Sequence, residues 1–261
     1  MTEMAAPYVL ETNNLCKNYG GIEALKDASF SMKKGETIAI VGDNGAGKST
    51  FVRNITGVEK STSGTVKFLG KEVNFENPFE ARRSGIETVY QNLALIDFLN
   101  VTENMFLGRE LTRFNFGLFS WLNKKKMKSE TKKLLSKTNV RINNLDQKLV
   151  NMSGGQRQCI AIARAAGWGE QLIIMDEPTA ALGVKETSAV EEIIKGLKKR
   201  EISVLIISHN LRQVFDLADK ICVFRQGRIV SMMSTKDVTE EQEIGRAHVE
   251  LQSPDHLVCR L

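Results

Sequence analysis

Short apolar runs recur along this chain, and each one ends in polar residues. The runs at 37–41 (TIAIV), 172–175 (LIIM) and 203–210 (SVLIISHN) have the length and the branched side chains of buried strands. A β-rich opening (YVLETNNLCK, ASFSMKK, GTVKFLGKEV) surrounds the first run, and strands alternate with helical patterns after Gln171. This alternation predicts an α/β fold built around a sheet.

The interval from about 93 to 167 has a different pattern, which is mostly helical. It contains the lysine-rich stretch at 123–137, which we predict to be a helix with a solvated face. We assign this interval as a helical subdomain. No internal repeat or low-complexity linker is visible in the sequence. We therefore expect one domain at 8–230, followed by a C-terminal extension at 231–243.

The first apolar run leads directly into VGDNGAGKST, residues 41–50. The spacing Gly-x-x-x-x-Gly-Lys-Ser is typical of a phosphate-binding loop, in which glycines let successive N–H groups face one anion. Residues 48–55 are compatible with a helix, so bound phosphates would lie at a helix N-terminus. We expect Lys48 to reach the β- and γ-phosphates of ATP and the Ser49 hydroxyl to bind Mg²⁺. The predicted ATP-binding residues of the loop are Gly42, Asp43, Asn44, Gly45, Ala46, Gly47, Lys48, Ser49 and Thr50.

The other two apolar runs end in residues suited to phosphoryl transfer. Asp176 is placed to hold Mg²⁺, and Glu177 beside it can act as the general base toward water. His209 follows the third run and can donate a hydrogen bond to the γ-phosphate. Taken alone, the acids could form a solvated turn and the histidine could be structural. Because α/β sheets bind ligands beyond the carboxyl ends of their strands, we predict that these side chains meet Lys48 in one catalytic site.

The segment NMSGGQRQCIAIARA, residues 151–165, offers a second anion cradle before a helical run. One domain does not need two cradles for one triphosphate. The order of motifs resembles the ATP-binding-cassette (ABC) family, whose signature is Leu-Ser-Gly-Gly-Gln; here Met152 stands in place of the leucine. In that family the signature of one subunit caps the ATP of the other. The resemblance implies a head-to-tail dimer in which Ser153, Gly154, Gly155 and Gln156 act in trans.

Two further residues match positions of the family. Tyr19 in CKNYGG resembles the aromatic residue that stacks on adenine, although a core tyrosine is the alternative. Gln91 in ETVYQNLALIDFLNVTENMFLGRE resembles the glutamine that senses Mg²⁺ and the attacking water, and an ordinary loop glutamine is the alternative. The resemblance thus adds Gln91 to the catalytic and Mg²⁺-binding residues and Tyr19 to the ATP-binding residues.

Within the family, the segments GIETVYQNLAL, NMFLGRE and MDEPTAALGVKET look like the ATPase subunit of simple-sugar importers, the group that handles fructose, ribose, galactose and xylose. Residues 180–183, Ala-Ala-Leu-Gly, depart from the usual Ser-Ala-Leu-Asp and resemble the fructose-type members. Gly183 therefore leaves the dimer-interface role of an aspartate unfilled. The resemblance implies permease subunits as partners, indirectly a sugar-binding protein, and a peripheral position at the cytoplasmic face of the cell membrane.

The net charge of +5 at pH 7 suggests a second class of function, a cassette ATPase that acts on nucleic acid or ribosomes. The excess charge is concentrated in the lysine-rich stretch at 123–137, where no aromatic residues interleave the lysines as a base-stacking surface needs. The phosphate loop and the signature are too close in sequence for the long coiled coil of chromosome ATPases. Only one set of motifs is present, so we expect no nucleic-acid partner.

The remaining features of the sequence indicate no further functional site. No apolar run approaches the length of a membrane span, and the start MTEMAAPYVLET lacks the basic and apolar regions of a signal peptide, so we expect a cytoplasmic chain. The four cysteines are far apart and are expected to be reduced structural thiols.

The end at 244–261 lacks periodicity, and its opening IGRAHV resembles a translated frame of a DNA-sequencing adapter. We predict a non-native or disordered tail there, on a truncated gene, and assign it no function.

Overall fold

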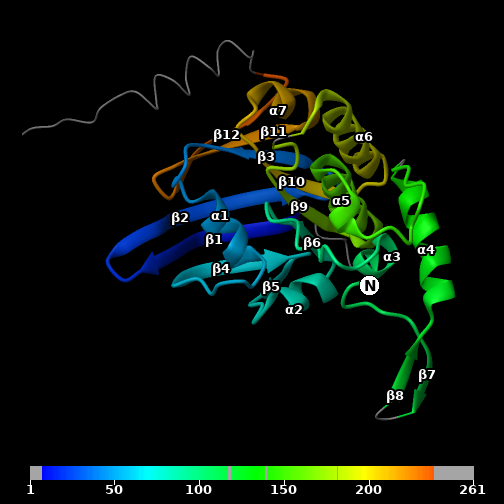
Figure 1. Ribbon diagram of the computed structural model, residues 1–261. Coiled ribbons are helices and arrows are strands. Elements are labelled where there is room, and N and C mark those ends of the chain that lie inside the picture. The colour runs from blue at the N-terminus through cyan, green and yellow to red at the C-terminus, as the bar shows by residue number, and fades with distance from the viewer. Residues whose placement is uncertain (1–7, 117–118, 139, 181, 238–261) are drawn as a thin grey trace, which may run out of the picture.

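Two sheets pack around one helix in the computed structural model, and a helical part lies beside them (Figure 1). The structure describes residues 8–116, 119–138, 140–180 and 182–237. The predicted tail at 244–261 and the end of the predicted extension at 231–243 lie outside these residues.

The larger sheet has six strands in the order β12-β11-β3-β10-β9-β6. Its strands are parallel except for β12, which pairs antiparallel with β11. All residues of β3 and β10 are buried, as expected for central strands covered on both faces. The strands are β3 (Thr37–Val41), β6 (Ile86–Val89), β9 (Leu172–Asp176), β10 (Ser203–Ile207), β11 (Lys220–Arg225) and β12 (Arg228–Ser234). Since β12 ends at Ser234, the sheet runs past the domain end predicted at Val230.

The β-rich opening forms the second sheet, which is antiparallel and has the order β2-β1-β4-β5. Its strands are β1 (Tyr8–Tyr19), β2 (Ile22–Lys33), β4 (Ser63–Phe68) and β5 (Lys71–Val73). Helix α1 (Lys48–Ile55) lies between the two sheets, because its Phe51, Val52 and Ile55 share one buried cluster with residues of both. The end of the phosphate loop that leads into α1 is thus packed between the two sheets, since Ala46 belongs to the same cluster.

Alternate residues of the central strands face opposite sides of the larger sheet. Leu172 and Ile174 of β9 join the cluster around α1, whereas Ile173 and Met175 pack with helices α5 (Gly154–Trp168) and α6 (Val184–Lys199) on the other side. This alternation follows from the two-residue period of a strand. Besides α5 and α6, the helices associated with the sheets are α1, α2 (Pro78–Arg83) and α7 (Leu211–Leu217).

The interval 93–167 forms the helical part and has a buried cluster of its own, which includes Phe106, Met127, Leu135, Leu149 and Ile160. Its helices are α3 (Val101–Met105), α4 (Lys124–Lys137), the 3₁₀ turn η1 (Leu149–Asn151) and α5 (Gly154–Trp168). It also holds a β-hairpin that the helical prediction missed, formed by β7 (Thr112–Phe116) and β8 (Phe119–Leu122). The hairpin projects away from the body of the molecule beyond the start of α4 (Figure 1).

Among the described residues, no helix combines the length and the apolar character that crossing a membrane requires.

Candidate active site

The loop between β3 and α1 has two glycines at which a side chain would meet the backbone of a neighbouring segment. Gly42 has a φ of +146°, and a Cβ atom there would lie 2.2 Å from the carbonyl oxygen of Phe224. Gly47 has a φ of +104°, and its Cβ would lie 2.8 Å from the carbonyl oxygen of Ala24. Gly47 is also the N-cap of α1 and provides no side-chain cap, so the first N–H groups of the helix are left for a ligand.

Lys48 is buried at the centre of this loop. Its ammonium nitrogen donates hydrogen bonds to the carbonyl oxygens of Gly42 at 2.7 Å and Asp43 at 2.8 Å. Burial lowers the pKa of Lys48, while the charges of Glu177, Asp176 and Asp43 oppose that shift. Lys48 therefore lies where two acids and the loop converge, as the sequence predicted.

Asp176 and Glu177 occupy the carboxyl end of β9. Burial raises the pKa of Asp176, and the nearby charge of Lys48 opposes the rise. Glu177 adopts a left-handed backbone with a φ of +53°, which is uncommon for a residue with a side chain. Its N–H donates to the carbonyl oxygen of Ile207 at 3.0 Å, which fixes this conformation against β10. The turn aims the Glu177 side chain toward His209.

Glu177 and His209 form a close pair. The Nδ1 atom of His209 lies 2.8 Å from the Oε1 atom of Glu177. The Glu177 side chain is 11% exposed, whereas that of His209 is 67% exposed. Burial raises the pKa of Glu177, and the imidazole of His209 is the first of the groups that oppose this rise. A buried carboxylate with a raised pKa is suited to accept a proton from water.

Most of the residues predicted to bind ATP, bind Mg²⁺ or act in catalysis meet around one cavity of about 300 Å³, but Gly42, Asp43 and Tyr19 do not line it. Its lining joins the phosphate loop to the ends of β6, β9 and β10, and besides the predicted residues it includes Ala24 and Ile207, which no sequence signal marked. The lining residues are Ala24, Asn44, Gly45, Ala46, Gly47, Lys48, Ser49, Thr50, Gln91, Asp176, Glu177, Ile207 and His209. This convergence of a phosphate loop, two acids, an amide and an imidazole can bind a triphosphate and activate water.

The donors on this cavity fit Mg²⁺. The Ser49 hydroxyl, the Gln91 amide and the Asp176 carboxylate offer oxygen atoms, which hard cations prefer. Within the described part of the chain, no group of three or more His, Cys, Asp or Glu side chains forms a metal site. This arrangement suits Mg²⁺, which is usually held by one or two carboxylates together with substrate phosphates.

Tyr19 lies at the end of β1, beside α1, and does not line the cavity. Its hydroxyl donates a hydrogen bond to Glu59, and Lys17 lies 5.1 Å from the centre of its ring. Burial has the largest effect on the pKa of Tyr19 and raises it, and the bond to Glu59 raises it further. A bond to Thr50 of the phosphate loop lowers the pKa of Tyr19 in turn. The side chain is 42% exposed, so it is not the core tyrosine of the alternative interpretation.

The second predicted cradle lies on the helical part, apart from the cavity. Ser153 caps α5: its hydroxyl accepts from the Gln156 N–H at 3.2 Å, and the Gln156 amide oxygen accepts from the Ser153 N–H at 3.1 Å. Ser153, Gly154 and Gln156 are exposed. Met152 is buried in the cluster of the helical part, so it replaces leucine with another apolar side chain.

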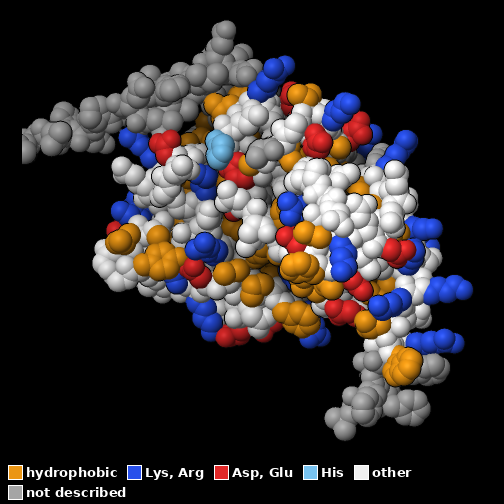
Figure 2. Space-filling model, viewed as in Figure 1, with side chains coloured by type: hydrophobic (Ala, Val, Ile, Leu, Met, Phe, Trp, Pro, Cys, Tyr) orange, Lys and Arg blue, Asp and Glu red, His pale blue; other side chains and the backbone are white. Residues whose placement is uncertain are grey.

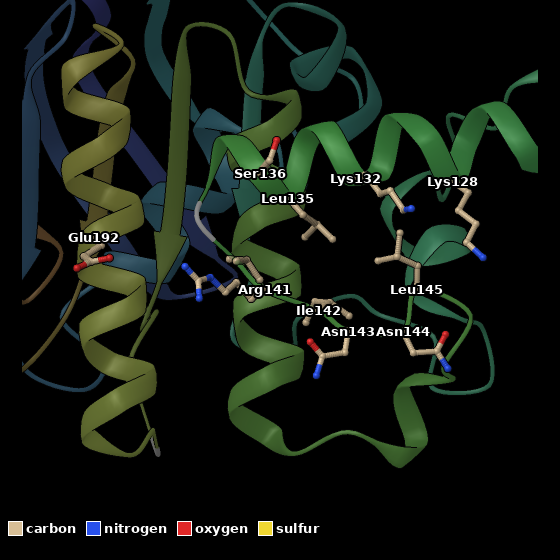
Figure 3. A pocket seen from close by; sticks show the side chains of 11 residues that line it. Lys128, Lys132, Leu135, Ser136, Arg141, Ile142, Asn143, Asn144, Leu145 and Glu192 are labelled. Carbon is tan, nitrogen blue, oxygen red and sulfur yellow. The ribbon is translucent and has the colours of Figure 1, made fainter.

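A larger cavity, of about 970 Å³, lies on the helical part between α4 and the segment that follows it. Figure 3 shows Lys128, Lys132 and Arg141 around it, together with Leu135 and Leu145. Basic side chains gather over α4 (Figure 2), and several of them pair with acids, as Lys128 does with Asp146 and Lys133 does with Glu130. None of the predicted site residues lines this cavity, and α4 behaves as the solvated helix that the sequence predicted.

A family model and two similar proteins point to the same class of protein. The family described as "ABC transporter" matches residues 25–180. The xylose/arabinose import ATP-binding protein XylG of Sulfolobus acidocaldarius is 46% identical over 236 residues, which are 90% of this chain and 92% of that protein. The fructose import ATP-binding protein FrcA of Rhizobium meliloti is 43% identical over 90% of this chain and 92% of that protein.

The fold is similar to that of a solved ATP-binding cassette in a post-hydrolysis dimer bound to ADP and phosphate. The TM-score is 0.74 at 25% identity, and the similarity covers 87% of this chain and 98% of the solved one. The phosphate loop, the acids and the signature segment thus occur in a fold that is known to bind a nucleotide and to dimerise.

Proposed function

Because this chain belongs to the ABC transporter family, it is an ATP-binding and ATP-hydrolysing cassette, and we propose that it powers the import of a simple sugar through a membrane permease. The cavity that joins the phosphate loop, Asp176, Glu177, Gln91 and His209 is the observation that carries the hydrolytic part of this proposal. The two relatives are named as ATP-binding proteins of xylose/arabinose import and of fructose import, which supports a sugar as the cargo. Fructose is the first sugar to test, since residues 180–183 resemble the fructose-type members.

The roles of the side chains follow from their positions. Lys48 and the loop N–H groups face the charge that develops on the γ-phosphate, and Glu177 takes the proton of the attacking water. His209 donates to the γ-phosphate, and Gln91 orients the water. Ser49, Gln91 and Asp176 would hold Mg²⁺, which neutralises charge on the phosphates.

We assign the working form to a dimer of two copies arranged head to tail. Cassettes of this fold form dimers, and the exposed start of α5 at Ser153 supports the arrangement, because it lies away from the chain's own cavity. In the dimer, Ser153, Gly154, Gly155 and Gln156 of one copy cover the ATP on the phosphate loop of the other. ATP binding then closes the pair, and hydrolysis lets the copies part.

The role as an import subunit places the chain against permease subunits at the cytoplasmic face of the membrane, with a sugar-binding protein on the other side. The chain would act there as a peripheral subunit. The permease would carry the sugar, and the cassette would supply the alternation between its two states.

The rate of Mg²⁺-dependent ATP hydrolysis at several protein concentrations tests the proposal. We expect the rate of the wild-type protein to rise faster than linearly with its concentration, because each site needs two copies. Glu177→Gln should keep ATP binding and lose turnover by about a hundredfold or more, as removal of a general base does. Chelation of Mg²⁺ should abolish turnover in the wild type. Loss of ATP binding in Glu177→Gln would contradict the role of Glu177 as the base.

A further inference from the structure

A cluster of charged side chains centred on Glu87, four residues before Gln91, takes no part in the chemistry described above. Glu87 is on β6, and its carboxylate is buried. It forms an ion pair with Arg109, which follows α3, and its second oxygen lies 4.0 Å from the Nε atom of Arg82 on α2. One acid in the sheet therefore holds two basic side chains that come from different elements.

A third guanidinium belongs to the same cluster. Arg164 is on α5, the helix that begins at the signature, and burial lowers its pKa. The charges of Arg82 and Arg109 act in the same direction, and Glu87 is the group that opposes them. The contacts connect Arg164 to Glu87 through α5, because Arg109, the ion-pair partner of Glu87, lies against the ring of Trp168, four residues further along the same helix.

Arg164 holds the loop that carries Gln91. Its two terminal nitrogens donate to the carbonyl oxygens of Leu93 at 3.1 Å and Ala94 at 3.0 Å. Leu93 and Ala94 have φ values of +58° and +45°, so two successive residues other than glycine are in the left-handed region. Such a conformation persists only where its surroundings hold it in place. Gln91, two residues earlier, lines the ATP cavity.

Arg109 connects the cluster to the rest of the helical part. Its guanidinium lies 5.0 Å from the centre of the Trp168 ring, and the Trp168 Nε1 atom donates to the carbonyl oxygen of Met105 at 2.9 Å. Since Glu87 is part of the sheet, its carboxylate joins the sheet to both α3 and α5. A second tie runs from α5 to the same loop, where Arg157 pairs with Asp97 at 3.2 Å.

We propose that Glu87 is a positioning residue for ATP hydrolysis, which sets the place of Gln91 through Arg164 and couples it to the helix that carries the signature. This role rests on the proposed function. Without the carboxylate, Arg109 and Arg164 repel each other, the hold on Leu93 and Ala94 loosens, and Gln91 leaves its place on the cavity. Nucleotide binding, which depends on the loop at 42–50, is unaffected.

The test compares Glu87→Gln, Glu87→Asp and the control Glu76→Gln, which removes an exposed ion pair with Lys60. For each variant kcat, KM, the Kd for ATP and the melting temperature are measured. We expect Glu87→Gln to lower kcat by about tenfold to a hundredfold, as misplacement of a positioning group does. Its Kd for ATP should match the wild-type value, Glu87→Asp should recover part of kcat, and Glu76→Gln should match the wild type throughout.

An unchanged kcat in Glu87→Gln, or a loss of kcat and ATP affinity together in proportion to the folded fraction, would overturn the positioning role. If Glu87→Gln does not fold, Arg164→Gln takes its place, because it removes the donors to Leu93 and Ala94 and leaves the ion pair of Glu87 with Arg109 intact. A low kcat with wild-type ATP affinity supports the role, and a wild-type kcat refutes it. A wild-type protein that hydrolyses no ATP at any concentration would overturn the proposed function as well, whereas active wild type with an unaffected variant overturns the positioning role alone.

Discussion

Two glycines of the phosphate loop are needed for different reasons, and substitution by alanine separates them. A Cβ at Gly42 would overlap the carbonyl oxygen of Phe224, whereas a Cβ at Gly45 would meet nothing within 4 Å and would enter the cavity instead. We expect Gly42→Ala to lower the free energy of unfolding by about 2–5 kcal/mol. Gly45→Ala should cost about 1–2 kcal/mol for its left-handed backbone and weaken ATP binding by about tenfold.

Urea unfolding and ATP titration of the two variants check this pair. The ranking of the two variants in stability and in ATP affinity matters more than the absolute values, because both substitutions add the same methyl group. A Gly45→Ala protein that binds ATP normally but unfolds as readily as Gly42→Ala would show that the cavity side of Gly45 is not where phosphate lies.

The Glu177–His209 pair predicts the direction of a pH effect. Burial raises the pKa of Glu177, so the base becomes protonated at a higher pH than an ordinary glutamate, and kcat should fall on the acid side accordingly. The imidazole of His209 lowers the pKa of Glu177, and its removal lets that pKa rise further. The acid limb of the pH profile of kcat should therefore move to higher pH in His209→Asn. An acid limb that stays in place or moves to lower pH would argue against this coupling.

At the scale of elements, α6 begins at a residue that cannot cap it. Gly183 is the N-cap and makes no side-chain hydrogen bond, and a Cβ there would lie 2.7 Å from the Oε2 atom of Glu186. We expect Gly183→Ser to stabilise the protein by a few tenths of a kcal/mol, since a serine hydroxyl caps better than glycine, with about 0.5 kcal/mol as the upper end. Gly183→Asp should gain less, because it sets two carboxylates side by side. The midpoints of urea unfolding rank the stability of the two variants. A Gly183→Asp protein more stable than Gly183→Ser would contradict the expected repulsion between the new carboxylate and Glu186.

The elements that the sequence predicts well are those with strong local signals. The bounds of β3 and α1 match the prediction, because a continuous apolar run, a glycine loop and a helical run follow one another without a break. The hairpin of β7 and β8 was missed, although TRFNF and FSWL alternate aromatic and polar residues, which is a strand signal that the surrounding helical pattern concealed. The short β6 was also missed, since four residues give little periodicity.

The candidate site also has some residues that the sequence brings together and others that it does not. Lys48, Asp176, Glu177 and His209 could be brought together from sequence, because each follows a buried strand and strand ends meet at one edge of the sheet. The cluster around Glu87 could not, because its arginines come from α2, from the segment after α3 and from α5. Only the packing of the helical part on the sheet brings them together, and no spacing in the sequence encodes that contact.

At the scale of the whole molecule, the arrangement of two copies predicts that ATP binding and dimerisation can be separated. Ser153 is exposed on the helical part and does not line the chain's own cavity, whereas Glu177 does. In the Glu177→Gln background, which binds ATP without turnover, we expect ATP to convert the monomer to a dimer. Adding Ser153→Glu places a negative charge where the phosphates of the other copy would lie, and like charges in such an interface cost several kcal/mol, about 2–5.

The doubly substituted protein should therefore remain a monomer with ATP, while each monomer still binds ATP with the affinity of Glu177→Gln alone. Light scattering reports the mass of the complex, and ATP titration of dilute protein reports the affinity. Ser153→Thr, which keeps a hydroxyl cap on α5, serves as the control and should still dimerise. If Ser153→Glu weakened ATP binding in the monomer, Ser153 would act on the ATP of its own chain, and the head-to-tail arrangement would be wrong. Ser153 does not line the cavity of its own chain, so the proposed head-to-tail dimer predicts that a second copy brings the cap and the cavity together around one phosphate.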